Sequence, residues 1–437
     1  MLKYVTLALA SLTMATPAWA IDIQVVKITD TVDAWLVEDH TNPLLTLKFG
    51  FEGGSRWDEV GKEGTTALAF GSLNEGAGDQ DAETFLGILQ DEAVSMAGSA
   101  GFKWSTVSFQ TPTASIDFAF DALETMLTDP AFDSLGVERM RRDALASAVQ
   151  RDRSPGAQLG EAFYNELWGE DEPRNREFSG DLETIPGITR EDLLAVKNKI
   201  IGRNNVLIAA VGDITPEELK TRVGAILEQL PEVTPPADID PPEFNTFESP
   251  VEVDFDQTQS IVFAVAPAFP RTDPDNYAAR VVNHILGGGG LGSRLSNKIR
   301  NELGLVYGVG SGYSAGEDYG TVSFNFATAN DAADEALDAT LEVWKEFAAN
   351  GPTREEVDEA ISYLTGSYAT FFLSSDDVVD YLLSIQIQEL PSDFPEFRND
   401  LFRDVTLEDA KRVAQRLYSE TLRFGVVGQP AEFTPDQ

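Results

Sequence analysis

The sequence predicts an α+β fold built from two similar halves of about 210 residues, each a β-sheet with helices on one face. Three observations lead to this prediction. Short identities recur along the chain at one spacing, a proline-rich stretch separates the two copies, and strands and helices are expected in the same order in both. A duplicated unit of this kind predicts two halves related by a pseudo-twofold axis.

The repeat rests on identities that are individually weak but share an offset of 215–217 residues. Because chance matches would scatter over many offsets, the shared spacing indicates an internal duplication. The matching pairs are Thr189-Arg190-Glu191-Asp192 with Thr406-Leu407-Glu408-Asp409, Asp121-Ala122 with Asp338-Ala339, Val107-Ser108-Phe109 with Val322-Ser323-Phe324, and Gly212 with Gly428.

The segment 231–250 has the composition of a linker, since it holds six prolines and shows no helical periodicity. We expect it to cross the surface as an extended tether between a first half, 21–230, and a second half, 251–437. Residues 1–20 combine one lysine, an apolar run and an Ala18-Trp19-Ala20 ending. This pattern is typical of a secretory signal peptide and predicts an exported protein.

Each half is expected to repeat one order of elements, read from alternation for strands and from spacings of three or four for helices. An opening strand is followed by a turn and a helix, a second strand, a helix and a longer helix. A short helix then begins at each Thr-x-Glu-Asp, where threonine can cap the first turn, and a strand closes the half. The expected strands are 44–51, 104–111 and 206–211, then 260–266, 321–327 and 424–427; the expected helices include 115–127 and 137–148, then 333–348 and 357–368.

The composition excludes several classes of function. Asp and Glu number 73 against 32 Lys and Arg, a formal charge of −41, and such a surface repels nucleic acid and anionic lipid. No later stretch reaches the roughly 18 apolar residues of a spanning helix, so no membrane insertion is expected. Without cysteine an exported chain has no disulfides and depends on a large core. We interpret the acidity as a solubility feature, with attraction of basic peptides as the alternative.

The most informative stretch is 286–314, in which a glycine-rich turn leads into a charged helix that should end at Gly304. Arg300 and Tyr307 lie seven residues apart across the helix exit, with Tyr307 in an expected strand, and both should face a concave interior. Their donors suit a peptide carbonyl or a developing oxyanion. A hinge, a solvated arginine and a core tyrosine are the alternative from spacing alone. The substrate loop is assigned to Gly287, Gly288, Gly289 and Gly290.

The run Gly292-Ser293-Arg294-Leu295, followed by Ile299-Arg300 and Gly304-Leu305-Val306-Tyr307, resembles the second-half signature of the insulinase/pitrilysin metallopeptidases. The resemblance extends from about residue 22 to the end of the chain. It implies two mostly antiparallel sheets covered by helices, and a role for Arg300 and Tyr307 in binding substrate and the transition state. Small members of the family form heterodimers, including mitochondrial processing peptidase and periplasmic bacterial pairs, so a periplasmic location is implied as well.

Catalytic members carry an inverted zinc motif, H-x-x-E-H, in the first half. The frame is present here as Gly53-Gly54-Ser55-Arg56 and Gly61-Lys62-Glu63-Gly64, but the motif positions are Ala67, Phe70 and Gly71. The later ligand should lie in the long helix, where 144–149 offers no carboxylate. The two histidines, His40 and His284, are interpreted as structural or surface residues. We therefore expect no metal or cofactor in this chain, with zinc only in a partner subunit.

The resemblance thus implies the non-catalytic subunit of a heterodimeric zinc metallopeptidase that cleaves peptides or small unfolded proteins. Its partner would carry H-x-x-E-H, while this chain would close a chamber over an extended peptide and donate hydrogen bonds from Arg300 and Tyr307. A peptide-binding scaffold or carrier with no protease partner is the alternative. Hydrolysis by another mechanism is disfavoured, because cysteine is absent and no histidine lies in a nucleophile–base arrangement.

Overall fold

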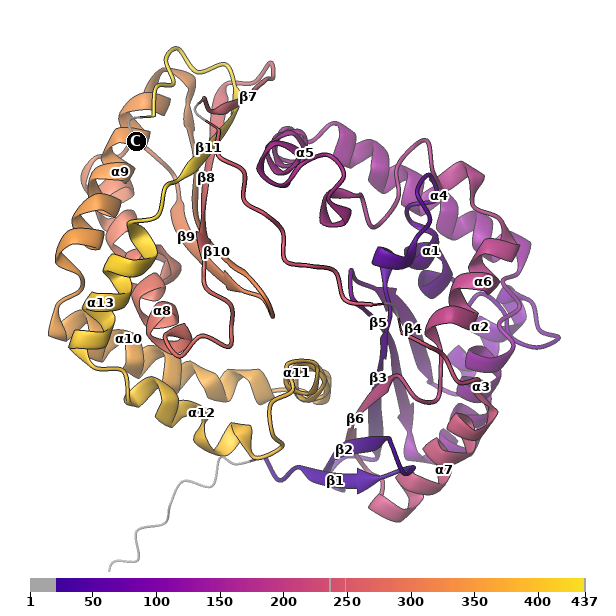
Figure 1. Ribbon diagram of the computed structural model, residues 1–437. Coiled ribbons are helices and arrows are strands. Elements are labelled where there is room, and N and C mark those ends of the chain that lie inside the picture. The colour runs from indigo at the N-terminus through magenta and orange to yellow at the C-terminus, as the bar shows by residue number, and fades with distance from the viewer. Residues whose placement is uncertain (1–20, 236, 248, 436–437) are drawn as a thin grey trace, which may run out of the picture.

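Two β-sheets, one from each half of the chain, face each other across the protein in the computed structural model (Figure 1). The structure describes residues 21–235, 237–247 and 249–435, so the segment interpreted as a signal peptide, 1–20, lies outside the described residues. Most helices lie on the outer side of the sheets. The predicted α+β fold in two halves is confirmed.

The first half is built on a six-stranded sheet. Its strands are β1 (Gln24–Lys27), β2 (Asp33–Glu38), β3 (Leu44–Glu52), β4 (Ser95–Ala100), β5 (Trp104–Pro112) and β6 (Val206–Gly212). They lie in the order β1-β2-β6-β3-β5-β4, and every neighbouring pair is antiparallel except β2 with β6.

The second half repeats this sheet without a counterpart of β1. Its strands are β7 (Val251–Asp254), β8 (Gln259–Ala268), β9 (Val309–Ala315), β10 (Gly320–Ala329) and β11 (Arg423–Gly428). Their order is β7-β11-β8-β10-β9, and the one parallel pair is β7 with β11. Strand for strand the two sheets correspond, which confirms the predicted duplication.

Helices cover the outer faces and complete two separate cores. In the first half they are α1 (Thr65–Gly71), α2 (Ala82–Asp91), α3 (Ile116–Thr128), α4 (Ser134–Asp152), α5 (Pro155–Trp168), α6 (Arg190–Ile200) and α7 (Pro216–Gln229). In the second half they are α8 (Asn276–Asn283), α9 (Ala333–Asn350), α10 (Arg354–Gly366), α11 (Ser375–Ile387), α12 (Phe394–Arg403) and α13 (Leu407–Tyr418). None of these described helices is long and apolar enough to cross a bilayer.

The two Thr-x-Glu-Asp segments begin helices in the same way. Thr189 caps α6, and Thr406 caps α13, each accepting a hydrogen bond from the backbone N–H three residues later. In both, the aspartate at that third position accepts a bond back from the threonine N–H. This reciprocal pairing satisfies two donors that a helix start would otherwise leave open, so the segments fix where each helix begins.

Each half also places one helix on the inner face of the opposite sheet (Figure 1). Helix α11 of the second half packs on β6, where Leu382 and Leu383 contact Ala209 and Val211 in one apolar cluster. Helix α5 of the first half packs on β7 and β11, and its Phe163 joins a cluster on the second sheet. Helices α5 and α11 occupy the same place in the order of elements of their halves. A twofold relation between the halves therefore predicts that each packs on the sheet of the other half.

Two strand glycines make room for these exchanged helices. A Cβ atom at Gly50 in β3 would lie 2.8 Å from Leu383 Cδ1, and one at Gly425 in β11 would lie 2.9 Å from Leu159 Cδ1. Real side chains do not approach so closely, since packed interiors leave no such overlap. The missing side chains therefore set the distance between helix and sheet in both halves.

The described part of 231–250 is an extended, largely exposed chain that runs from one half to the other. Asn245 fastens it to both. Its N–H donates to the carbonyl of Leu167 in α5 at 2.8 Å, and its carbonyl accepts from Arg423 Nε in β11 at 3.1 Å. The segment is therefore extended and exposed, as expected, and it is hydrogen-bonded to elements of both halves.

The main disagreement with the sequence concerns the edges of the sheets. The strand expected to open the first half, 44–51, is the central β3, because β1 and β2 precede it. In the second half β7 precedes β8, and β4 and β9 form the opposite edges. These strands are short or rich in Gly, Ser and Ala (SMAGSA, VGSGYSA), and such sequences lack the β-branched and aromatic residues typical of strands.

Candidate functional site

Helix α1 carries the three positions at which the resemblance places the zinc motif, and their side chains offer no nitrogen, oxygen or sulfur. Phe70 is fully buried in the first core, and Ala67 and Gly71 are half-buried. A Cβ atom at Gly71 would lie 3.3 Å from Met140 Cε of α4, so an apolar side chain fills the neighbouring space. Nothing at these three positions can coordinate a metal ion.

The residues around the motif positions make hydrogen bonds and an ion pair that hold α1 against its neighbours. Asp58 accepts hydrogen bonds from Gly64 N–H and Thr66 N–H, each at 3.0 Å, and burial raises the pKa of its carboxyl to about 6. Lys62 pairs with Asp192 at 2.5 Å, which ties the start of α1 to the capped start of α6. These residues therefore hold α1 in place without a metal.

Among the described residues, no alternative set of ligands stands in for the missing motif. Glu75 is buried beyond α1, but its carboxylate is taken by Arg139 of α4 at 2.5 Å. The ring nitrogens of His40 contact Asp213 and Glu38, whereas His284 stacks on Tyr363 with ring centroids 4.8 Å apart. Within the described ranges, no three His, Cys, Asp or Glu side chains gather as a metal site would require.

Arg300 and Tyr307 are brought together at the exit of a π-helical segment, η7 (Ser296–Glu302), which ends before Gly304 with φ of +68°. Arg300 Nε donates to the Tyr307 carbonyl at 2.8 Å, and its guanidinium carbon lies 5.6 Å from the Tyr307 ring centroid. This pairing folds the loop 303–308 back over the helix end. Their expected proximity and the helix end at Gly304 agree with the structure.

Two expectations about Tyr307 are wrong in the isolated chain. The residue lies in a loop, because β9 begins two residues later, at Val309. Its side chain is 88 % exposed rather than enclosed in a concave surface, while Arg300 is half-buried. Val306, directly before it, is buried in the second core, so the neighbouring tyrosine points the other way. The tyrosine ring is therefore presented to solvent.

The glycine run is helical rather than a turn, which corrects the sequence interpretation. Gly287 and Gly288 belong to a π-helical turn, η5 (His284–Gly288), that continues α8. A Cβ atom at Gly287 would lie 2.3 Å from the Ser311 nitrogen in β9, and Gly290 has φ of +65°. Close packing thus accounts for glycine at 287, and the left-handed backbone accounts for it at 290. The assignment of Gly287, Gly288, Gly289 and Gly290 to a substrate loop stays a prediction.

The rest of the second-half signature serves the fold. Arg294 donates to both carboxylate oxygens of Glu356, at 2.7 and 2.8 Å, and lies over the Phe347 ring at 4.8 Å. The Ser293 hydroxyl donates to the Gly290 carbonyl at 2.7 Å, and Leu295 is fully buried. Packing explains these positions, whereas it does not explain an exposed tyrosine beside Arg300.

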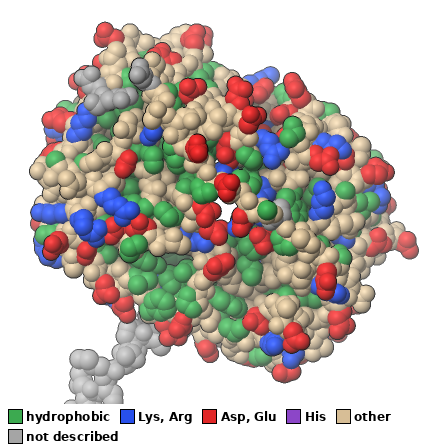
Figure 2. Space-filling view, viewed as in Figure 1, with side chains coloured by type: hydrophobic (Ala, Val, Ile, Leu, Met, Phe, Trp, Pro, Cys, Tyr) green, Lys and Arg blue, Asp and Glu red, His purple; other side chains and the backbone are tan. Residues whose placement is uncertain are grey.

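A pocket of about 470 Å³ between the halves was not found from the sequence. It draws its walls from the first half, the linker and the second half, and Figure 2 shows an opening between the halves with charged side chains around it. Of its lining residues, only Arg56 belongs to a motif recognised in the sequence, Gly53-Gly54-Ser55-Arg56. The basic residues that line it are Arg56, Lys103, Arg174, Arg176 and Arg271.

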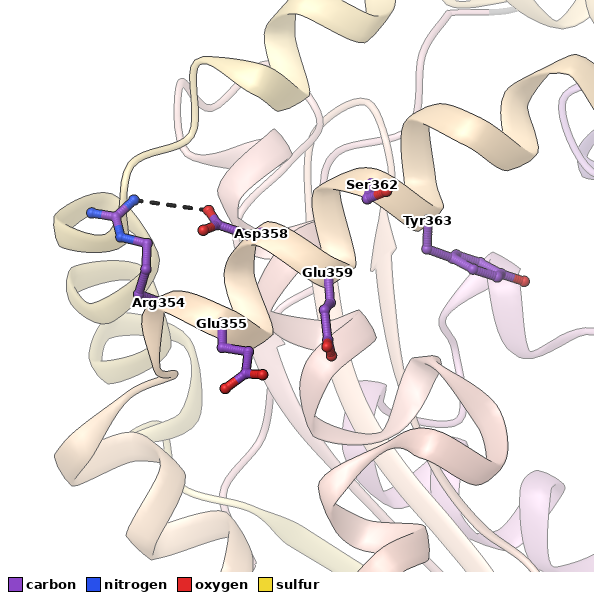
Figure 3. Close-up of a pocket in the computed structure, with 6 residues that line it drawn as sticks. All are labelled: Arg354, Glu355, Asp358, Glu359, Ser362 and Tyr363. Carbon is purple, nitrogen blue, oxygen red and sulfur yellow. Dashed lines mark ion pairs between the residues drawn. The ribbon is translucent and has the colours of Figure 1, made fainter.

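A wider hollow of about 750 Å³ lies along α10, and Figure 3 shows that all of its labelled side chains come from that one helix. They include three carboxylates, of which Asp358 lies 3.9 Å from Arg354. Because no second element opposes them, this is an open acidic surface rather than a cleft. The lining residues are Arg354, Glu355, Asp358, Glu359, Ser362 and Tyr363.

The chain is similar to proteins of one family. Residues 187–364 match the family described as "Peptidase M16 inactive domain". The chain is 25% identical over 334 residues to the non-peptidase homolog YmxG of Helicobacter pylori, covering 76% of each, and 22% identical over 390 residues to an uncharacterized zinc protease of Rickettsia bellii, covering 86% of this chain and 90% of that protein. A crystal structure of a peptidase M16 inactive domain from Pseudomonas fluorescens matches with a TM-score of 0.84 at 25% identity, covering 95% of this chain and 100% of that one.

Proposed function

This chain is a member of the peptidase M16 (insulinase/pitrilysin) family that lacks the zinc-binding residues, and from that premise we propose that it is the non-catalytic subunit of a heterodimeric zinc metallopeptidase. In this proposal a second family member supplies H-x-x-E-H and the metal. This chain closes a chamber over an extended peptide and presents Arg300 and Tyr307 to the bound substrate.

The observation that carries the proposal is the free hydrogen-bonding capacity of this pair. Arg300 uses Nε on the Tyr307 carbonyl and Nη1 on Asn301, at 2.8 and 3.3 Å. Within the described chain, its Nη2 and the Tyr307 hydroxyl have no hydrogen-bond partner and remain able to donate. A donor aimed at a developing oxyanion in a site closed from water contributes roughly 2.7–4 kcal/mol, a hundredfold or more in rate. A subunit without metal can therefore still be required for turnover.

The surroundings of Tyr307 also suit contact with another chain. Leu291 and Leu303 are exposed in the segment 286–314, and Tyr363 of α10, Phe371 of η9 (Ser367–Phe372) and Leu373, the residue after η9, are exposed as well. His284 of η5 stacks on Tyr363, so α10 lies beside the start of the glycine-rich segment. Grouped apolar side chains on a strongly charged surface favour a protein interface. A partner covering this region would enclose Tyr307 and remove it from water.

Two further parts of the proposal rest on the sequence. Export to the periplasm rests on residues 1–20, and recovery of the mature chain in the periplasmic fraction, beginning at Ile21, tests it. Peptide binding without any protease partner is the second candidate function. It is favoured by the open edges of β4 and β9, to which an extended peptide can add as a further strand.

The test is co-expression with a family member that carries H-x-x-E-H. We expect the two chains to elute together in size-exclusion chromatography and to cleave an unfolded protein only when mixed, with activity lost on chelation. A zinc-bearing chain that is fully active alone and does not bind this protein would contradict the proposal. If this chain still bound peptide in that case, the scaffold function would be the better account.

A further inference from the structure

The pocket between the halves reverses the charge of the rest of the protein. The whole chain has 73 acidic and 32 basic residues, yet the pocket is lined by five basic side chains and three acidic ones. Neighbouring opposite charges account for only some of these cations. Lys103 contacts Asp238 and Glu317 at 3.2 and 2.9 Å, and Arg174 contacts Glu172 at 2.6 Å.

Arg56 is the most constrained of these cations. Its side chain is 3 % exposed, and its backbone is held in a short helical turn, η1 (Ser55–Trp57), by a bond from its N–H to the Phe102 carbonyl. Its Nη2 lies 3.5 Å from Glu52 and its Nη1 lies 3.4 Å from Asp238, but Nε and Nη2 make no hydrogen bond within the described chain. A buried donor without a hydrogen-bond partner lowers the stability of the fold, unless a ligand or a water molecule accepts from it.

Two other pocket residues have the same unmet capacity. The indole N–H of Trp168 is buried without an acceptor among the described residues. Arg271 is half-buried, and no described acidic side chain lies within 4 Å of its charged nitrogens. All of these open groups are donors, so the ligand they fit is an acceptor, and the positive charge favours an anion.

Asp238 shows how such an anion can be seated. This linker carboxylate lies between Arg56 and Lys103, at 3.4 and 3.2 Å, although its side chain is 72 % exposed. It comes from the linker rather than from either folded half, and its contacts are long. A ligand carboxylate can occupy the adjoining space beside Arg271 or take the place of Asp238.

The walls indicate what accompanies the anion. Trp168 and Tyr319 meet with ring centroids 6.1 Å apart, and Arg174 lies 5.9 Å from the Phe102 ring and 5.5 Å from the Tyr319 ring. Aromatic faces favour an apolar or aromatic side chain next to the charge. With five cations opposed by three carboxylates, the net positive charge is small and suits a monoanion better than a polyphosphate.

We propose that this pocket binds the C-terminal carboxylate of a peptide that ends in an aromatic or apolar residue. The inference rests on the proposed peptide-binding function and specifies which peptides are held. The carboxylate accepts from Arg56 and Arg271, and the terminal side chain packs against Trp168 and Tyr319. Both halves and the linker then contact one ligand, so peptide binding also fixes the halves relative to each other.

The test uses the purified chain alone and fluorescence anisotropy of peptides labelled at the N-terminus. Three peptides share one sequence and end in Phe with a free carboxylate, in Phe amide, or in Phe amide with Glu in the penultimate position. We expect the free-carboxylate peptide to bind at least tenfold more tightly than either amide. Equal affinity for the plain amide would overturn the proposal, and equal affinity for the Glu-containing amide would overturn the terminal assignment.

Three variants complete the test. Arg271→Gln should abolish the tenfold preference, because it removes a cation that contacts the ligand carboxylate while breaking no ion pair within the described chain. Asp238→Asn should strengthen binding severalfold, because it removes the carboxylate that competes for Arg56. Arg354→Gln, on the exposed surface of α10, is the matched control and should keep the preference. An unchanged preference in Arg271→Gln would overturn the proposal. Failure of all three peptides to bind would also count against the proposed function, whereas binding without discrimination would overturn only this inference.

Discussion

The two halves have one strand order but differ at the positions of the family signatures. In the first half, α1 keeps its position while Ala67, Phe70 and Gly71 supply only carbon. In the second half, Arg300 and Tyr307 keep polar groups that the fold does not use. This difference shows that the residues that hold the fold together are not the ones that would carry out a reaction. Buried positions hold the sheet and its helices, so metal ligands can be lost without loss of the fold.

The corresponding helices α4 and α10 also differ, in the charged side chains that they carry and in how those side chains are paired. Two arginines of α4 pair with carboxylates outside the helix, Arg139 with Glu75 and Arg151 with Glu177. Helix α10 instead presents carboxylates to solvent (Figure 3). With so few basic residues in the chain, those of the first half serve mainly to fasten loops and to line the pocket between the halves.

The largest effect is expected from returning a motif residue to the first half. Phe70→Glu places a carboxylate in an apolar core and removes a fully buried ring. We expect a loss of about 4 kcal/mol or more in the free energy of unfolding, measured by urea denaturation followed by circular dichroism. Ala67→His, at a half-buried position, is the control and should cost less than about 1.5 kcal/mol. Wild-type stability in Phe70→Glu would mean that α1 still tolerates a carboxylate there.

The next effect concerns the exchanged helices. Leu159→Ala in α5 and Leu383→Ala in α11 each remove a buried side chain that packs on the opposite sheet. Both should cost about 2–4 kcal/mol of unfolding free energy, whereas Leu135→Ala on the exposed surface of α4 should change it by less than about 0.5 kcal/mol. A large cost in only one of the two helices would show that the exchange is not energetically reciprocal.

Arg300 and Tyr307 should affect turnover and not stability. In the reconstituted pair, Arg300→Ala or Tyr307→Phe should lower kcat/KM by roughly 10²-fold, the scale of one lost transition-state donor. The loss should lie in kcat if these groups hold the transition state, and in KM if they hold the peptide. Lys298→Ala, on the same helical segment and paired with Glu302, is the control. Full turnover by both variants would argue against catalytic support.

The smallest effect is expected at Arg294. Its loss removes two charge-assisted bonds to Glu356, at about 1.5–3 kcal/mol near neutral pH. Partial burial acts to raise the pKa of Glu356, but hydrogen bonds from Arg294 and Thr353 lower it to about 2. Because this folded value lies below the ordinary 4.5, the stabilisation is present above that pH and is lost as pH falls toward 2. The stability gap between wild type and Arg294→Ala should therefore narrow over that range; a constant gap would contradict the assignment.

Local signals in the sequence were sufficient for the central elements. The alternating apolar residues of β3 and β10 and the threonine caps of α6 and α13 act within a few residues, so periodicity and spacing reveal them. The lost zinc motif could be recognised in the same way, because absent histidines need no fold to interpret them.

What could not be predicted depends on contacts between distant segments. The pocket joins Arg56, Trp168, Asp238 and Arg271, which come from separate parts of both halves and the linker. Gly287 resembled part of a flexible turn because the strand that crowds it, β9, has little strand character of its own. The exposure of Tyr307 depends on whether a partner covers it, which no single chain encodes locally.

The exchange of α5 and α11 has a consequence for biosynthesis. The inner face of the first sheet, with Ala209 and Val211, receives its cover only when α11, ending at Ile387, has been made. The first half therefore waits for most of the polypeptide to emerge before its apolar inner surface is shielded, and such long-range closure slows folding. Synthesised as separate fragments, the halves would each expose one bare sheet, and they would complement each other when mixed.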